Sequence, residues 1–124
     1  MAYPRWLAKV NKRVFNPREV RKGKRPVVVH VGRRSGAEYR TPLDAHPTTE
    51  GFVLVARYGP GSDWVRNVQA AGTAVLRFEG QDHQLVTPRL VGLDEAAAAL
   101  APGHDPGKDF AKAEDYLLLE RAAA

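Results

Sequence analysis

The residues best suited to chemistry lie between positions 31 and 43, in a turn with glycines at both ends and adjacent arginines inside it. Glycine permits a tight turn whose backbone N–H groups are free to point at a ligand. The side-chain donors of this segment are Arg33, Arg34, Ser35 and Arg40. Such a donor-rich, acceptor-poor surface suits phosphate or carboxylate. The pattern therefore predicts an anion-binding turn between two strands.

Several kinds of site are excluded by what the chain lacks. With no cysteine among 124 residues, there are no disulfides, thiolate metal sites or cysteine nucleophiles. The four histidines show no HxH, HxxH or HExxH spacing, so we expect no metal site. Neither serine lies in a GxSxG motif, which argues against a serine hydrolase. Redox chemistry in this chain would therefore need an organic cofactor.

The composition is typical of one small soluble domain, with 44% hydrophobic and 27% charged residues. No apolar stretch approaches the roughly 20 residues that span a bilayer, and the N-terminus lacks the uncharged core of a signal peptide. We therefore expect a cytoplasmic protein. The net charge is uneven, being +8 over residues 1–25 and −3 over residues 26–124. A basic segment of this kind suits an acidic ligand, an anionic membrane or nucleic acid.

The basic segment predicts a short amphipathic helix over residues 3–15, with Pro4 in its first turn. Because Asn16-Pro17 ends this helix, residues 1–26 form a helix with a connector, and 27–124 form the main domain. The apolar helix face would pack on that domain. The alternatives are peripheral contact with the inner face of an anionic membrane and closure over a bound ligand.

Apolar periodicity and turn residues predict the elements that position the anion-binding turn. Strands are expected at 27–31, 39–46, 52–58, 74–79, 83–91 and 116–121. A helix over 63–71 that ends at Gly72 is inserted among them, and an alanine-rich helix over 95–101 precedes a loop at 102–107. About six antiparallel strands with one inserted helix and short flanking helices indicate a mainly β (α+β) fold built as a small β-barrel.

The order of these motifs resembles that of the deazaflavin-dependent nitroreductase and quinone reductase family. The matching segments are GRRSG at 32–36, RTPL at 40–43, VLVA at 53–56 running into Tyr58-Gly59, and WVRN at 64–67. The resemblance covers about residues 27–91. It implies a split β-barrel like that of FMN-binding proteins, with coenzyme F420 as cofactor. FMN is the alternative, because a related barrel family binds it.

The resemblance also implies which residues hold the cofactor. Its acidic tail would be held by Arg33, Arg34, Ser35 and Arg40, and its ring would be lined by Thr41, Pro42, Leu43, Ala56, Arg57, Tyr58 and Gly59. The inserted helix would brace the pocket with Trp64 and Asn67. The chain lacks the longer loop near 57–58 and the tyrosine-rich C-terminal helix of other members, so the substrates of those members are not implied.

Several candidate residues also have a purely structural interpretation. Arg40 has the acids Glu38 and Asp44 nearby in sequence as ion-pair partners. His30 lies in an apolar run, where a hydrogen-bonded core residue is commoner than a catalyst. Trp64 on a helix is expected to serve core packing before it lines a pocket.

Two functions are compatible with this set of residues. The first is an F420-dependent oxidoreductase that transfers hydride to a small electrophile such as a quinone, an enone or a nitroaromatic. Tyr58 or Tyr116 would then orient or protonate the substrate. The alternative is a non-catalytic carrier for a deazaflavin, a flavin or a lipid. Nucleic-acid binding is not expected, because the basic segment has few interleaved aromatic residues. The oligomeric state is left open.

Overall fold

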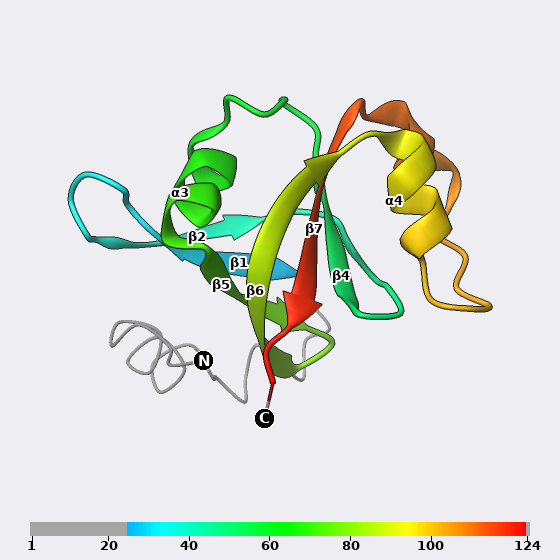
Figure 1. Cartoon of the computed structure of the whole chain (residues 1–124), viewed down its shortest axis with the longest axis horizontal. Helices are drawn as coiled ribbons and strands as arrows, with labels where there is room; N and C mark the ends of the chain where they lie inside the picture. The colour runs from blue at the N-terminus through cyan, green and yellow to red at the C-terminus, as the bar shows by residue number, and fades with distance from the viewer. Residues whose placement is uncertain (1–24, 124) are drawn as a thin grey trace.

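The computed structural model describes residues 25–123, so the helix expected over residues 3–15 lies outside the described part. Within that part, seven strands form one antiparallel sheet in the order β2-β1-β5-β6-β7-β4-β3, which curls into a half-barrel (Figure 1). The strands are β1 (Val27–Val31), β2 (Glu38–Pro42), β3 (Ala45–Pro47), β4 (Gly51–Ala56), β5 (Thr73–Phe78), β6 (Gln81–Val91) and β7 (Asp115–Arg121). The predicted mainly β barrel is confirmed, with seven strands in place of about six.

The additional strand arises because the predicted strand 39–46 bends in its middle. Its first part, β2, pairs with β1, and its second part, β3, pairs with β4 at the other end of the sheet. At the bend, the Leu43 N–H donates to the Pro26 carbonyl at 3.0 Å, and the Asp44 carbonyl accepts from the Val55 N–H at 2.9 Å. The chain therefore crosses from one sheet edge to the other within two residues.

β4 is buried on both faces, which explains why its sequence is almost wholly apolar, and the apolar residues 116–119 of β7 pair with it. Phe52 and Leu54 of β4 face the barrel interior, where they join the main core with Leu117 of β7. Val53 and Val55 face the opposite side and pack with a second cluster. Two separate cores thus share one central pair of strands.

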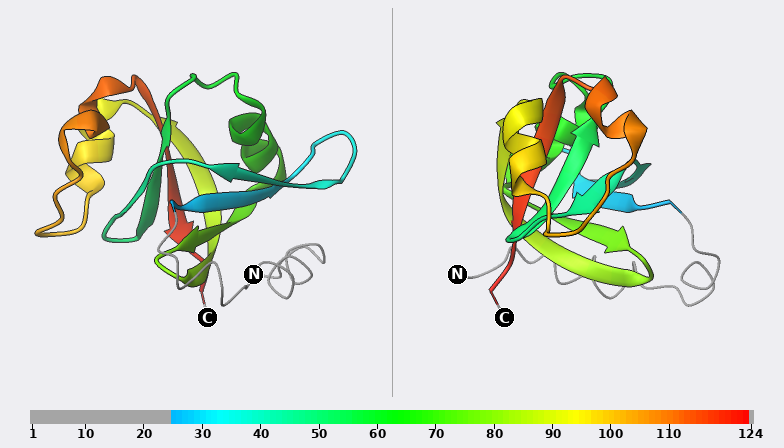
Figure 2. Two further views of the ribbon diagram at one scale, coloured as in Figure 1. Left: turned by 180° about the vertical axis from the view of Figure 1, so that it is seen from behind. Right: turned by 90° about the vertical axis from the view of Figure 1, so that its right-hand side faces the viewer.

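Two helices and one 3₁₀ turn cover the ends of the sheet (Figure 2). The inserted helix α3 (Asp63–Ala71) ends at Gly72, whose φ of 75° allows the left-handed cap, as predicted. The second helix, α4 (Leu93–Ala99), begins two residues earlier than expected. The 3₁₀ turn η1 (Lys108–Lys112) was not predicted, and its Phe110 joins α4 in the second core.

The strands predicted at 74–79 and 83–91 form a hairpin, β5–β6, with a connection shorter than the three residues between the predicted strands. Phe78 pairs with Gln81, so only two residues connect the strands. These residues, Glu79 and Gly80, have φ values of 48° and 82°. Positive φ at both central positions is the geometry that follows the natural twist of a two-residue hairpin.

Tyr116, one of the two phenols considered as a catalyst, is a structural residue. Its side chain is fully buried in the second core, in contact with the ring of Phe110. Its hydroxyl donates toward the carbonyls of Phe110 (2.5 Å) and Ala113 (2.9 Å), which anchors the η1 segment to β7. Burial raises the pKa of this phenol, so it stays neutral. It has no open path to a substrate, and we do not retain it as a catalytic residue.

Replacing Tyr116 by phenylalanine is therefore expected to lower stability without affecting ligand binding. Tyr116→Phe leaves two buried carbonyl groups without their donor, which costs about 1–3 kcal/mol of unfolding free energy. Urea unfolding followed by circular dichroism measures this cost. A variant of unchanged stability would contradict the structural role assigned to the hydroxyl.

Candidate functional site

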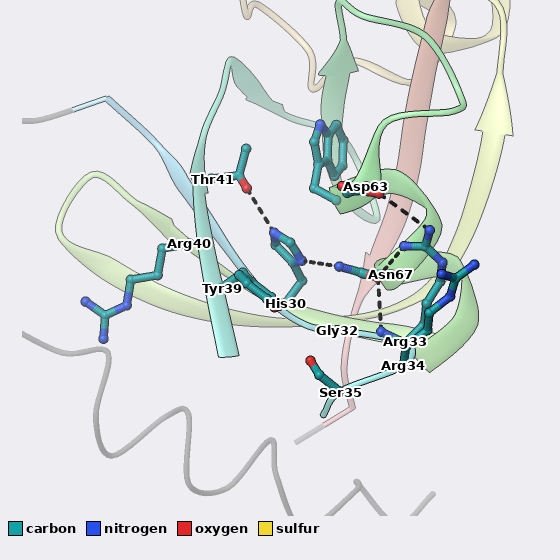
Figure 3. Close-up of a pocket in the computed structure, with 11 residues that line it drawn as sticks. His30, Gly32, Arg33, Arg34, Ser35, Tyr39, Arg40, Thr41, Asp63 and Asn67 are labelled. Atoms are coloured by element: carbon teal, nitrogen blue, oxygen red, sulfur yellow. Dashed lines mark hydrogen bonds and ion pairs between the residues drawn. The ribbon is translucent and has the colours of Figure 1, made fainter. Parts of the chain in front are cut away.

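A pocket of about 550 Å³ lies between the turn after β1, one face of β1 and β2, and the start of α3 (Figure 3). It is lined by His30, Gly32, Arg33, Arg34, Ser35, Tyr39, Arg40, Thr41, Asp63, Trp64 and Asn67. The strands and the helix come from separate parts of the chain, and the turn projects beside them. The predicted anion-binding turn thus forms one wall of a real pocket.

Strand alternation decides which side chains of β1 and β2 face this pocket. His30 pairs across the strands with Tyr39, and the rings of the two residues stack with centroids 5.8 Å apart. Thr41 lies on the same face, two residues further along β2. Arg40 must therefore point its side chain to the opposite face, as Figure 3 also shows.

The position of Arg40 changes the role expected for it. Its guanidinium lies 3.4 Å from the carboxylate of Glu38, which has the same strand parity. Arg40 lines the pocket from its position on β2, but its charged group is not gathered with those of Arg33 and Arg34. The expectation that all three arginines form one clamp is therefore corrected, because adjacent strand residues face opposite sides.

α3 fixes the turn from the other side of the pocket. Asp63 and Asn67 are four residues apart and so lie on one face of the helix. The Oδ1 atom of Asn67 accepts from the backbone N–H of Arg33 at 3.1 Å and from its Nη1 at 2.8 Å. Nη2 of Arg33 lies 3.4 Å from the Asp63 carboxylate. Arg33 therefore connects the turn to α3, and its donors are already used within the protein.

His30 continues this hydrogen-bonded chain beneath the pocket. Its ring is 3% exposed, with Nδ1 lying 3.1 Å from the amide nitrogen of Asn67 and Nε2 lying 2.9 Å from the hydroxyl of Thr41. Burial lowers the pKa of His30 from 6.5 to about 4, although Asp63 opposes this shift. The prediction of a buried, hydrogen-bonded histidine is confirmed, and the ring is neutral at pH 7.

The tip of the turn offers backbone donors that the fold leaves unused. The Gly32 N–H donates to the Ala37 carbonyl, the Gly36 N–H donates to the Gly32 carbonyl, and Arg33 is bonded to α3. Among the described residues, no partner is found for the N–H groups of Arg34 and Ser35 or for the guanidinium of Arg34. Two successive N–H groups beside a cation are donors of the kind that anion-binding sites use.

Gly32 lets the side chains of Ser35 and Tyr39 lie close to the backbone of the turn. A Cβ at this position would lie 2.7 Å from the Ser35 hydroxyl and 2.9 Å from the Tyr39 ring. The Ser35 hydroxyl accepts from the Ala37 N–H at 3.1 Å, which leaves its own hydrogen available to a ligand.

A smaller hollow of about 150 Å³ shares Thr41 and Trp64 with the main pocket. Its remaining lining residues are Arg25, Pro42, Leu43, Asp44, Val55, Arg57, Tyr58 and Ser62. Arg57 is bound to the Asp44 carboxylate at 2.6 Å, and this hydrogen bond raises the pKa of Arg57 and lowers that of Asp44. Tyr58 is 93% exposed at the rim.

The residues predicted to line the cofactor ring are thus only partly brought together. Thr41, Pro42, Leu43, Arg57 and Tyr58 surround the smaller hollow. Ala56 is in the main core and lines neither space, because it lies on the inward face of β4. Gly59 also lines neither space, since it lies in a turn in which its N–H donates to the Ala56 carbonyl.

Four pocket residues were not among the predicted site residues, and one of them, Gly32, belongs to the predicted turn itself. His30 and Tyr39 could have been identified by placing the alternating face of β1 opposite that of β2. Asp63 could have been identified from its spacing of four residues from Asn67 on one helix face. Both signals need the strand pairing and the helix placement to be known first.

A comparison with protein-family models identifies the family to which this architecture belongs. Residues 8–103 match the model of the F420H₂-dependent quinone reductases, which is most of the chain. The chain belongs to this family. It is therefore a deazaflavin-dependent oxidoreductase that uses coenzyme F420, as the resemblance in the sequence implied.

Solved structures support the fold of this family member. A structure of an F420 reductase is similar over 79% of this chain and 86% of that chain, with a TM-score of 0.52 and 12% sequence identity. At this low identity, the similarity concerns the fold alone. No curated protein sequence matches the chain.

The residues present fit a cofactor with an anionic tail. The turn combines the Arg34 guanidinium, the Ser35 hydroxyl and two unused backbone N–H groups, which are the donors that a phosphate or carboxylate requires. Over residues 25–123, no group of three or more acidic or histidine side chains is placed to hold a metal ion. In the same range, no helix is long and apolar enough to cross a membrane.

The buried imidazole predicts a specific pH dependence of stability. Because its folded-state pKa is about 4 and its ordinary value is 6.5, only the unfolded chain takes up a proton at His30 between these values. The contribution of the neutral His30 ring to the free energy of unfolding is fully present above pH 6.5 and is lost as the pH falls to about 4. Urea unfolding of wild type and His30→Asn at several pH values measures the effect.

The wild-type protein should lose more stability than His30→Asn as the pH falls through this window. His46 and His83, whose pKa values are also lowered by burial, are common to both proteins and cancel in the difference. A stability difference that does not change with pH would show that His30 titrates normally.

Proposed function

We propose that this F420-dependent enzyme reduces a quinone, with the cofactor tail at the 32–36 turn and the acceptor at the hollow beside Tyr58. The observation that carries the proposal is that the two spaces are adjacent, with Thr41 and Trp64 lining both. One end is rich in anion donors, and the other is walled by Pro42, Leu43 and Val55. An extended cofactor with a charged tail and a planar ring matches this polarity.

The tail end relies on Arg34 and the backbone more than on Arg33 or Arg40. Arg33 is committed to Asn67 and Asp63, and the Arg40 guanidinium faces Glu38. Arg34 is exposed and has no partner among the described residues, so it is free to pair with a ligand anion. Ser35 adds a hydroxyl and a backbone N–H on the same side.

The acceptor end provides a flat aromatic surface and open access. Tyr58 is exposed at the rim of the smaller hollow, next to a turn containing two glycines and a proline. A quinone can stack on the phenol ring while the apolar walls hold the cofactor ring. When bound, reduced F420 supplies a hydride. The quinone also needs a proton to become a hydroquinone, and water reaches this exposed site to provide it.

The location of the tail is tested by comparing Arg34→Ala with Arg40→Ala. Loss of Arg34 should weaken binding of oxidised F420 about fivefold to tenfold, because a charge-assisted hydrogen bond is lost at a solvent-exposed site. Arg40→Ala should change the affinity by less than about twofold, since it removes only a surface ion pair. Quenching of cofactor fluorescence measures both dissociation constants, with FMN as the competing ligand.

Equal effects of the two substitutions would move the tail to the other face of β2. Tighter binding of FMN than of F420 would contradict the assigned cofactor site. Addition of salt should weaken wild-type binding more than Arg34→Ala binding, because fewer charges are screened in the variant.

The acceptor is tested with reduced F420 and the quinone menadione. Tyr58→Ala should raise the KM for menadione about threefold to tenfold through loss of stacking, and Tyr58→Phe should leave KM and kcat near the wild-type values. A large fall in kcat for Tyr58→Phe would instead assign proton donation to the phenol. If wild type binds F420 but oxidises none of it with quinone, enone or nitroaromatic acceptors, the chain is a cofactor carrier.

A further inference from the structure

One hydrogen-bonded chain runs beneath the main pocket from β2 to the turn. It links Thr41, His30, Asn67 and Arg33, and its members come from β2, β1, α3 and the turn (Figure 3). His30 and Asn67 are only 3% and 4% exposed, so water cannot readily replace their partners. In this hydrogen-bonded chain, whether one group donates or accepts decides whether the next group accepts or donates.

We propose that His30 is a positioning residue that fixes the orientation of the Asn67 amide and thereby holds the 32–36 turn in its ligand-binding shape. The inference rests on the proposed location of the cofactor tail at that turn. His30 itself has no direct part in anion binding in this arrangement. It acts through Asn67 on the backbone of Arg33.

Arg33, at one end of the hydrogen-bonded chain, sets the orientation of the Asn67 amide. Arg33 presents two donors to Asn67, its backbone N–H and its guanidinium. Only the carbonyl oxygen of the Asn67 amide can accept from both, so the amide nitrogen must point to His30. The reversed amide would place donors against donors in a buried site, which costs free energy at each unmet group.

His30 holds the Asn67 amide in this orientation because its Nδ1 is an acceptor that faces the amide nitrogen. Its Nδ1 lies 3.1 Å from the amide nitrogen of Asn67 and must be unprotonated to accept. The ring then carries its proton on Nε2, which donates to the Thr41 hydroxyl at 2.9 Å. A neutral ring with this tautomer is the one state that satisfies both neighbours.

The orientation of the Asn67 amide affects ligand binding through the backbone N–H groups of the turn. With the Arg33 N–H drawn to Asn67, the next two N–H groups in the turn, those of Arg34 and Ser35, are left for an anion. Asp63 and the stacked Tyr39 ring are the other groups that contact this network, and neither offers a second acceptor to the Asn67 amide nitrogen. The shape of the turn thus depends on a residue outside it.

The test compares two amide replacements of similar size. In His30→Asn, the side-chain oxygen lies near the former position of Nδ1 and can still accept from Asn67. In His30→Gln, the terminal amide reaches toward the former Nε2 and keeps the Thr41 contact instead. His30→Gln should therefore weaken F420 binding about tenfold and His30→Asn less than about threefold, with both proteins folded by circular dichroism.

Two further measurements separate positioning from a general structural effect. In the cofactor-free protein, the Arg33 amide should lose its hydrogen-exchange protection in His30→Gln and keep it in His30→Asn. In an Asn67→Ala background, which removes the amide through which His30 acts, His30→Gln should have little additional effect on F420 affinity. A full tenfold effect in that background would overturn the proposal.

The wild-type protein provides a test that does not depend on any variant folding. Nitrogen-15 shifts of the His30 ring should show the neutral tautomer with the proton on Nε2 at pH 7. The other tautomer, or a charged ring, would overturn the proposal. If wild type failed to bind F420, the proposed cofactor site would fall, whereas the ring tautomer and the Arg33 amide would still decide the positioning role.

Discussion

The functional end of the molecule depends on the bonds that Asn67 makes to Arg33 and His30. A turn of five residues has few contacts of its own, and its glycines make many conformations accessible to the unfolded chain. α3 supplies the missing constraint by accepting two hydrogen bonds from Arg33. Because these bonds are partly buried, water compensates only part of their loss. The geometry of the 32–36 turn, the proposed anion site, is thus set by a helix more than thirty residues away in sequence.

The rest of the fold holds α3 and the 32–36 turn in fixed positions relative to each other. α3 packs its Val65 and Val68 into the main core, which also contains Leu76 of β5. β1 and β5 are neighbours in the sheet, so the strand that leads into the turn rests on the same core as the helix. The second core, around Tyr116, lies on the other side of β4 and β7 and has no part in the pocket. Val55 is the residue through which this second core reaches the smaller hollow.

The sequence predicted most helices and strands well, but it did not predict which side chains of neighbouring strands lie on the same face. The β1 strand, α3 with its Gly72 cap and the β5–β6 hairpin follow from local patterns, because apolar periodicity and turn residues act within a few positions. The bend at Leu43-Asp44 was missed, since it is produced by hydrogen bonds to Pro26 and Val55. Such long-range partners leave no mark on the local sequence.

By itself, the sequence determined the chemistry: an anion-binding turn, the absence of thiols, and a motif order that implies a deazaflavin enzyme. Only the tertiary structure decided which groups act together. It turned the guanidinium of Arg40 to the other face of β2, bound Arg33 to α3 and placed His30 beneath the main pocket. Residue type is a local property, whereas the side of a strand and the partner of a hydrogen bond depend on how the whole sheet pairs.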